Sequence, residues 1–237
     1  MPLDATPVRP PVLERALSDP LLGKVALVSS FGADAVVLLH MVSELDPNLP
    51  VLMIDTEMLF DQTLDYQREV SAKLGLTNVQ IFRAPRAELL IQDADSILHV
   101  YDPDACCALR KTEPLQKALA PYNTWITGRR RDQTPERAKV KPVELDAFGR
   151  VKLSPLVDWS AQDVSDYIQA HQLPRHPLVK DGYLSIGCAP CTTPVSDKED
   201  PRAGRWRGRA KTECGIHLKP KGHSSGAARE MASERQL

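Results

Sequence analysis

Short apolar runs alternate with longer helical patterns between residues 24 and 93. Runs rich in Val, Ile and Leu are typical of buried strands, whereas apolar residues three and four positions apart are typical of helices that pack on a sheet. The pattern predicts strands and helices in alternation, at Val25–Ser29, Ala33–Leu45, Val51–Ile54, Leu59–Leu74 and Val79–Phe82. Such alternation indicates an α/β fold in which helices flank a parallel sheet.

The second half of the chain has a less regular pattern. It predicts a helix, a strand, a hairpin around Phe148-Gly149 and an amphipathic helix capped by Ser160, at Cys107–Leu119, Thr124–Thr127, Pro142–Leu153 and Ala161–His171. Regular pattern is lost after Pro174, and the last residues are rich in Ser, Ala and charge. We therefore expect an N-terminal extension, an α/β domain, a mobile C-terminal segment and a disordered tail, at residues 1–22, 23–200, 201–218 and 219–237.

Composition narrows the class of protein. At 237 residues, the chain is long enough for one α/β domain with appendages. Its 42% hydrophobic and 26% charged residues are ordinary for a soluble globular protein, and no apolar run approaches a membrane span. Because Met1 to Pro11 do not have the pattern of a signal peptide, we expect a cytoplasmic protein. We expect neither a nucleic-acid nor a membrane partner, and a homo-oligomer is left open.

Five cysteines carry the most specific chemistry: an adjacent pair, a C-x-x-C pair and a single residue, namely Cys106, Cys107, Cys188, Cys191 and Cys214. An odd count without an export signal disfavours a disulfide scaffold and favours metal ligation or a reactive thiol. Two pairs about 80 residues apart are compatible with zinc or with an iron–sulfur cluster. Adjacent side chains diverge on a helix, so a wide centre with several irons is easier for both to reach than one zinc. Taken alone, the adjacent pair is equally compatible with two buried, small hydrophobic residues.

The single cysteine lies in a basic part of the chain. Between residues 202 and 221 there are seven Lys or Arg and one acid, Glu213. Positive neighbours stabilise a thiolate, which is the nucleophilic form of cysteine, and local positive charge suits an anionic substrate. Cys214 is therefore a candidate nucleophile on a glycine-flanked segment, and His217 is a candidate to support it. The alternatives are an incidental free cysteine and a surface histidine.

Three polar turns follow predicted strands, at Ser29–Asp34, Asp55-Thr56 and Thr127–Gln133. In an open parallel sheet, ligands bind beyond the carboxyl ends of the strands, where backbone N–H groups and helix N-termini are exposed. The three turns thus predict an anion or nucleotide site at one edge. Each has a plainer alternative, a helix cap for the serine-rich turn and a solvated charge run for the arginines.

Four separated motifs together resemble one enzyme family. They are Cys106-Cys107-x-x-Arg110-Lys111, Thr127-Gly128-x-Arg130-Arg131-Asp132-Gln133, Gly187-Cys188-x-Pro190-Cys191, and Gly204-Arg205-Trp206 followed by Glu213-Cys214-Gly215-Ile216-His217. Their order is that of the assimilatory adenylyl-sulfate (APS) reductases, within the wider PAPS/APS reductase family. The resemblance covers roughly residues 22 to 218.

The resemblance implies an adenine-nucleotide α-hydrolase-like fold, a 4Fe-4S cluster, and reduction of 5′-adenylyl sulfate to sulfite and AMP for sulfate assimilation and cysteine biosynthesis. It makes Cys106, Cys107, Cys188 and Cys191 the cluster ligands and Cys214 the nucleophile. Residues 23–200 become the nucleotide- and cluster-binding domain, and residues 201–218 the catalytic segment. Substrate-binding positions implied by the match are Ser29, Phe31, Gly32, Asp55, Lys111, Gly128, Arg130, Arg202, Arg205 and Trp206, to which we add His217.

The same resemblance implies a mechanism. Cys214 would attack the sulfate sulfur to form an S-sulfocysteine, and thioredoxin or a glutaredoxin-like reductant would then release sulfite, while Lys111 links cluster and substrate electrostatically. One departure from the family pattern is the first loop, which reads Ser-Ser-Phe-Gly from Ser29 where better-known members have Ser-Phe-Ser-Gly. The two cysteine pairs favour APS, because reductases of 3′-phosphoadenylyl sulfate (PAPS) generally lack them. The alternatives are a PAPS or dual-substrate reductase and a non-catalytic nucleotide-binding regulator with iron–sulfur or zinc.

Overall fold

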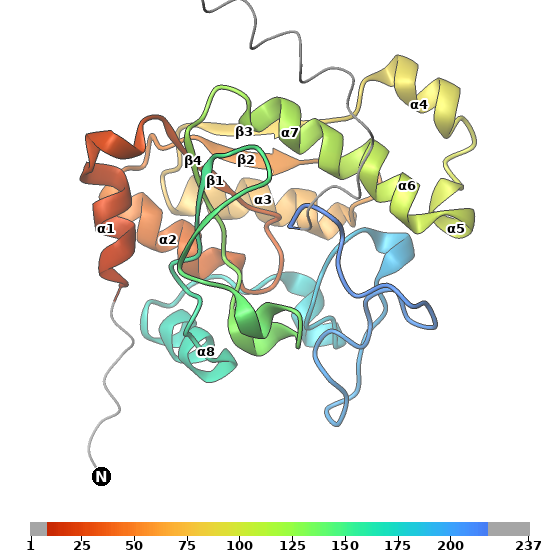
Figure 1. Cartoon of the computed structure of the whole chain (residues 1–237). Helices are drawn as coiled ribbons and strands as arrows, with labels where there is room; N and C mark the ends of the chain where they lie inside the picture. The colour runs from red at the N-terminus through yellow and green to blue at the C-terminus, as the bar shows by residue number, and fades with distance from the viewer. Residues whose placement is uncertain (1–8, 218–237) are drawn as a thin grey trace, which may run out of the picture.

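A computed structural model describes residues 9–217 and shows one six-stranded sheet (Figure 1). The strands lie in the order β3-β2-β1-β4-β6-β5, with bounds β1 Val25–Val28, β2 Val51–Ile54, β3 Val79–Phe82, β4 Thr124–Ile126, β5 Val143–Leu145 and β6 Val151–Leu153. All neighbouring pairs are parallel except β5 and β6, which form an antiparallel hairpin. The predicted α/β class and the predicted hairpin are confirmed.

Eight α-helices surround the sheet within the described part of the chain. Their bounds are α1 Pro11–Ser18, α2 Ala35–Leu45, α3 Asp61–Lys73, α4 Arg86–Gln92, α5 Leu98–Tyr101, α6 Pro103–Cys107, α7 Glu113–Leu119 and α8 Ala161–Ala170. Short 3₁₀ turns lie at Pro20–Leu22, Arg131–Gln133, Arg137–Lys139, Pro177–Asp181 and Ala189–Cys191. None of the helices between residues 9 and 217 has both the length and the apolar character needed to cross a membrane.

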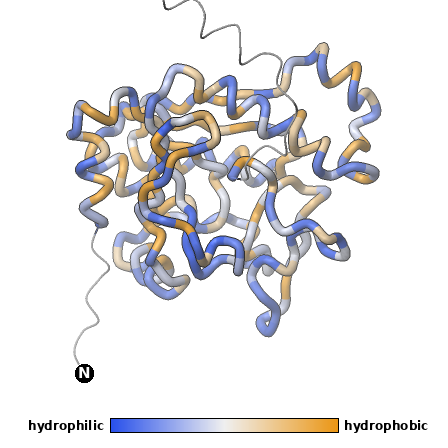
Figure 2. Tube along the Cα trace, viewed as in Figure 1, coloured by the Kyte–Doolittle hydropathy of each residue, from blue (hydrophilic) through white to orange (hydrophobic). Residues whose placement is uncertain are grey.

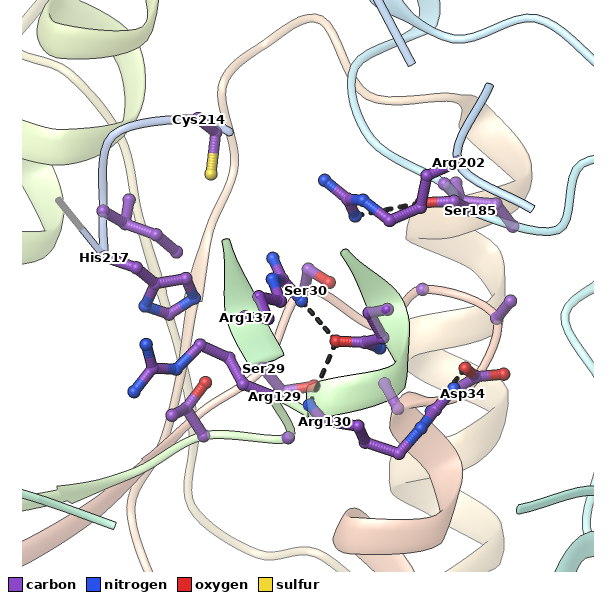
Figure 3. Close-up of a pocket in the computed structure, with 18 of the residues that line it drawn as sticks. Ser29, Ser30, Asp34, Arg129, Arg130, Arg137, Ser185, Arg202, Cys214 and His217 are labelled. Carbon is purple, nitrogen blue, oxygen red and sulfur yellow. Dashed lines mark hydrogen bonds and ion pairs between the residues drawn. The ribbon is translucent and has the colours of Figure 1, made fainter. Parts of the chain in front are cut away.

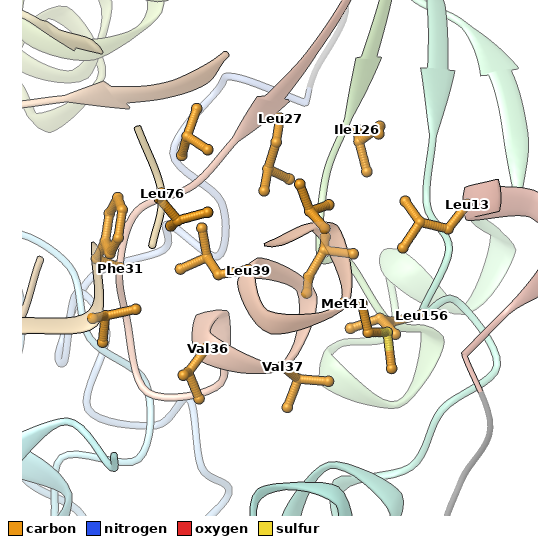
Figure 4. Packing of buried hydrophobic residues seen from close by; sticks show 14 of the residues in the cluster. Leu13, Leu27, Phe31, Val36, Val37, Leu39, Met41, Leu76, Ile126 and Leu156 are labelled. Atoms are coloured by element: carbon orange, nitrogen blue, oxygen red, sulfur yellow. The ribbon is translucent and has the colours of Figure 1, made fainter. Parts of the chain in front are cut away.

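The central strands β1, β2 and β4 pack on both faces of the sheet, and successive side chains of each strand point to opposite faces. Leu27 of β1 packs into the larger core with α1, α2, α3 and α8, whereas the preceding Ala26 packs with α7 on the other face (Figure 4). Apolar segments accordingly concentrate in the interior, and the peripheral loops are mostly hydrophilic (Figure 2).

The N-terminal residues differ from the expected extension. From Pro11 they form α1, and Leu13 and Ala16 of this helix are buried in the larger core. Three-residue spacing brings these two side chains to the same helix face, so residues 11–18 are part of the folded domain. The helices α4 and α5 were not predicted. The tail expected at residues 219–237 lies outside the described residues.

The predicted helix at Cys107–Leu119 is part of a longer helical segment. It begins with α6, whose N-cap carboxylate on Asp102 accepts hydrogen bonds from the N–H groups of Asp104 and Ala105 at 3.0 and 2.9 Å. A π-helical turn at Ala108–Thr112 then leads into α7. Such turns occur frequently at functional sites.

Candidate functional site

A cavity of about 300 Å³ opens at the carboxyl ends of β1 and β4. These two strands are neighbours in the sheet. From β1 the chain first proceeds to one side, through β2 and β3, and then returns to the other side of β1 with β4, so the strand order reverses between β1 and β4. In open α/β sheets, such a switch point is where ligands bind. The turns after β1 and β4 line the cavity with residues 29–30, 32–35 and 127–130, and the C-terminal part of the chain lines it with residues 184–186, 200–202, 205–206, 213–214 and 216–217 (Figure 3).

The first turn brings Ser29, Ser30 and Gly32 to the cavity. The Ser29 hydroxyl accepts a hydrogen bond from the Phe31 N–H at 3.2 Å, and Phe31 has a positive φ of 48°. This backbone bend turns the Phe31 ring away from the cavity and into the larger core, where it is fully buried (Figure 4). Phe31 therefore shapes the turn from behind and does not line the cavity.

Asp55 also lies outside the cavity lining. Its carboxylate, at the end of β2, accepts hydrogen bonds from the Arg83 Nε at 2.9 Å and from the Glu57 N–H at 2.9 Å. Asp55 is 4% exposed, so these partners satisfy it within the protein. The structure thus joins Asp55 to Arg83, the residue after β3, and leaves it outside the cavity lining.

The three arginines after β4 are separated by acids. Arg129 donates to Glu144 at 2.5 Å, Arg130 donates to Asp34 at 2.7 Å, and Arg131 pairs with Asp158. Arg129 and Arg130 line the cavity together with Gly128, whereas Arg131 does not. The repulsion expected among the arginines is relieved in this way, and Nε of Arg129 remains a buried donor without a protein partner.

The C-terminal segment closes the cavity through two anchors. The Arg137 guanidinium donates to both carboxylate oxygens of Glu213, at 2.5 and 2.8 Å. The His217 ring stacks on Trp125 of β4, with ring centroids 5.9 Å apart and an interplanar angle of 8°. Between these anchors, the Cys214 sulfur points into the cavity (Figure 3).

Cys214 is 8% exposed and lies among cations. Burial by itself raises the pKa of a thiol, but Lys111, Arg205 and the Ile216 N–H stabilise the thiolate and bring the pKa of Cys214 below its ordinary value. Lys111, Arg202, Arg205 and Trp206 also line the cavity. The predicted nucleophile and the predicted anion-binding residues therefore share one site.

His217 stays neutral in this setting. Burial and the positive charges of Lys152, Arg129 and Arg137 lower the pKa of His217 well below its ordinary value. Its Nδ1 is buried without a partner. Lys152 lies 4.8 Å from the centroid of the Trp125 ring, and burial together with Arg129 lowers the pKa of Lys152 to about 7.

The four paired cysteines line a second, smaller pocket that shares Lys111, Arg205, Trp206 and Cys214 with the cavity. The Oγ1 of Thr56 lies 3.2 Å from the Cys188 sulfur, and the Ala189 N–H donates to the Met58 carbonyl at 2.7 Å. These contacts hold the C-x-x-C loop against the end of β2. The structure thus brings together two cysteine pairs that are far apart in sequence.

The cysteine pocket suits a centre that ionises thiols. Burial, Cys107 and Cys188 raise the pKa of Cys106 to about 12, and burial raises the pKa of Cys107 to about 11. A bound cationic centre would remove this penalty, since metal ligation deprotonates a thiol. Among residues 9–217, no three His, Cys, Asp or Glu side chains converge as a site for a single metal ion. The four thiols nevertheless line one pocket, and thiolates are the residue type that ligates an iron–sulfur cluster.

Residues 24–194 match the model of the phosphoadenosine phosphosulfate reductase domain. The chain belongs to this family. It is 48% identical to the adenosine 5′-phosphosulfate reductase of Mesorhizobium japonicum, over 87% of this chain and 81% of the relative. It is 45% identical to the enzyme of the same name from Streptomyces coelicolor, over 80% of each chain. The expected family membership is confirmed.

Solved structures support the same fold. The phosphoadenylyl-sulfate reductase of Candida auris has a TM-score of 0.64 and 28% identity, over 76% of this chain and 89% of that chain. The FMN adenylyltransferase of Candida glabrata has a TM-score of 0.54 and 18% identity, over 79% of this chain and 62% of that chain. The expected adenine-nucleotide α-hydrolase-like fold is confirmed.

Three residues of this reductase domain were missed by sequence reasoning: Arg137, Lys152 and Trp125. Trp125 and Lys152 face each other across β4 and β6, in paired register. Both were predicted as ordinary members of strands, and alternation in so short a strand does not identify a functional side chain. Arg137 acts through Glu213, which lies 76 positions away, so no local pattern marks it.

Proposed function

We propose that this protein reduces 5′-adenylyl sulfate to sulfite and AMP as a step of assimilatory sulfate reduction. The observation that carries the proposal is the position of Cys214, at the junction of the switch-point cavity and the cysteine pocket. Lys111 and Arg205 line both pockets and favour the Cys214 thiolate. Two of the relatives are named for this activity.

The cavity suits a nucleotide with a charged end. Ser29, Gly32 and Gly128 would present backbone and hydroxyl groups to the adenylate, with Arg130 beside them. Arg202, Arg205, Trp206 and Lys111 would surround the sulfate end, near Cys214. Phe31 and Asp55 would support the nucleotide loops indirectly, from the core and from Arg83. Neutral His217 would serve as a hydrogen-bond partner for substrate.

The Cys214 thiolate would attack the sulfate sulfur. An S–S bond forms while the S–O bond to the phosphate breaks, and AMP leaves with the electron pair of that bond. The product on the enzyme is an S-sulfocysteine. Positive groups at the sulfate end would offset the charge that moves onto the phosphate oxygen.

A dithiol of the thioredoxin or glutaredoxin class would complete the reaction. One of its thiolates attacks the Cys214 sulfur and releases sulfite, and its second thiol then closes a disulfide and frees the Cys214 thiolate. The dithiol thereby supplies both electrons. We propose a reducing compartment, the cytoplasm, for this chemistry, because it depends on a thiol nucleophile and a dithiol reductant.

Cys106, Cys107, Cys188 and Cys191 would hold a 4Fe-4S cluster. When bound, the cluster would supply charge and fix the position of the loops that meet at its pocket. Lys111, which lines both pockets, would connect that charge with the substrate. Residues 23–200 would thus bind nucleotide and cluster, and residues 201–218 would carry the nucleophile.

A second candidate is PAPS reduction, alone or together with APS. A relative from Gloeobacter violaceus is named phosphoadenosine 5′-phosphosulfate reductase and is 42% identical over 82% of each chain. The cysteine pairs favour APS by the resemblance described above. Sulfite release measured with each nucleotide, a thioredoxin and iron-loaded enzyme would decide between them. A preference for PAPS would overturn the APS assignment, and absence of sulfite with both would favour a non-catalytic regulator.

A further inference from the structure

Arg205 occupies a position between the two pockets. Its side chain lines both the switch-point cavity and the cysteine pocket. Its guanidinium carbon lies 4.4 Å from the centroid of the Trp206 ring, and its Nε is buried without a partner. The backbone of Arg205 is held by an antiparallel bridge to Thr192. The guanidinium lies over the loop that precedes Cys188, next to Gly187.

Gly187 lies directly under that guanidinium. A Cβ atom built on Gly187 would come within 3.0 Å of three heavy atoms, and all three belong to the Arg205 guanidinium. Gly187 is absent from the glycines with positive φ, so its backbone conformation is one that alanine adopts. The obstacle to a side chain at this position is therefore Arg205 itself.

Gly204 provides a contrast. A Cβ atom on Gly204 would collide with the backbone carbonyl of Thr193. The N–H of Thr193 donates a hydrogen bond to the Gly204 carbonyl at 2.9 Å, so the two backbones are paired here. A side chain at Gly204 would thus separate two paired backbones. At Gly187, by comparison, the obstructing atoms are the far end of a flexible side chain, so alanine would displace a charge and leave the backbone in place.

We propose that Gly187 is a positioning residue for Arg205. By having no side chain, it leaves the room that the guanidinium needs to lie between the cysteine pocket and the sulfate end of the cavity. The ligand named here, adenylyl sulfate, rests on the proposed function. The role of Gly187 adds to that function a residue that lines neither pocket.

A double-mutant cycle tests the proposal by calorimetric titration of adenylyl sulfate, in a Cys214→Ser background that prevents turnover. The four proteins carry no further change, Gly187→Ala, Arg205→Ala, or both. Loss of a charged hydrogen-bond donor commonly weakens binding about tenfold or more, so we expect this loss for Arg205→Ala and much of it for Gly187→Ala. The double variant should match Arg205→Ala within about twofold, because the clash is then absent. Equal weakening by Gly187→Ala in both backgrounds, or no weakening in either, would overturn the proposal.

Two further measurements separate this proposal from the proposed function. Crystal structures of the Gly187→Ala protein should show the guanidinium displaced from the Trp206 ring; an unmoved guanidinium would refute the role of Gly187 even if adenylyl sulfate does not bind. Iron content reports on the neighbouring Cys188. Iron lost in Gly187→Ala and retained in the double variant supports a clash with Arg205. Iron lost in both contradicts it, because alanine would then disturb the cysteine loop directly.

Discussion

Arg137 holds Glu213 through two hydrogen bonds, one to each carboxylate oxygen, across 76 positions of sequence. Both side chains are largely buried, at 13% and 6% exposure, and Arg202 lies 3.7 Å from the same carboxylate. Glu213 immediately precedes Cys214. The pair therefore ties the nucleophile-bearing segment to the 3₁₀ turn at Arg137–Lys139.

We predict that Glu213→Gln loosens this segment. Loss of the carboxylate charge leaves Arg137 without its bidentate partner, and buried pairs are strongly destabilised when one member is removed. Removal of the Glu213 charge by itself also favours the Cys214 thiolate, so alkylation by iodoacetamide is compared at a pH where the thiol is ionised in both proteins. It should become faster by roughly tenfold, a change of about 1.4 kcal/mol in the opening equilibrium. Glu199→Gln is the matched control, because Glu199 pairs with Arg207 of this segment at the surface. Equal rates in both variants would show that the pair does not hold the segment.

Cys214→Ser should abolish sulfite release while nucleotide binding and iron content persist. Serine is a far weaker nucleophile at neutral pH, and an S-sulfo intermediate requires the sulfur. Sulfite assays, calorimetry and iron analysis on the same preparation would check the three properties together. Sulfite release at the wild-type rate would exclude Cys214 as the nucleophile.

Lys111→Met should move the pH dependence of Cys214 alkylation to higher pH. Lys111 is the strongest of the cations that favour the thiolate, so its removal raises the pKa of Cys214 and decreases the thiolate fraction at neutral pH. We also expect sulfite release to fall about tenfold or more, since a cation is removed from the sulfate end. Lys117→Met is the control on the neighbouring helix α7, where Lys117 pairs with Glu88 at the surface. An unchanged pH profile in Lys111→Met would contradict the assigned electrostatic role.

Cys191→Ser should reduce bound iron after anaerobic reconstitution, as should the equivalent change at Cys106. Each would remove one of four thiols around the cysteine pocket. Iron and sulfide analysis with an absorption spectrum would measure the effect, and Cys214→Ser provides the cysteine control outside the proposed ligand set. Full iron content in both ligand variants would refute the assignment of this pocket.

Leu13→Ala should destabilise the domain by about 2–4 kcal/mol, because Leu13 is completely buried against the larger core. Leu21→Ala, at a side chain that is 92% exposed, should change the free energy of unfolding by less than about 0.5 kcal/mol. Urea denaturation of the two variants would compare them. Equal stabilities would show that α1 does not contribute to the folded domain, as expected of an N-terminal extension.

The strands β1 and β2 were predictable because they are largely buried, uninterrupted apolar runs bounded by polar turns. Helix α4 was not, because it is short and buries one residue, Leu89, so no periodic apolar face repeats along it. Helix α1 has an apolar face, but only Leu13 and Ala16 of that face are buried. This pair follows a proline-rich start that is typical of an N-terminal extension, so the helix was not predicted. Short elements with a single anchor depend on tertiary contacts that sequence patterns do not show.

For the candidate site, the five cysteines and the turns after β1 and β4 were predictable because their residue types are specific. The orientation of Phe31 was not, since it depends on a positive φ in the turn. Asp55 was correctly expected at the end of β2, but its nearest cation, Arg83, comes from the next strand. Pairings of this kind arise only when the sheet brings separate turns together.

The π-helical turn between Cys107 and Glu113 behaves like an α-helix that contains one inserted residue. Deleting Ala108 would restore regular winding and rotate the adjacent cysteines by about 100° relative to α7. Leu115 and Leu119 of α7 are fully buried against the sheet, so the cysteines would have to turn instead. Whether the Cys106 and Cys107 thiols face the same pocket therefore depends on how far α6 is rotated relative to α7.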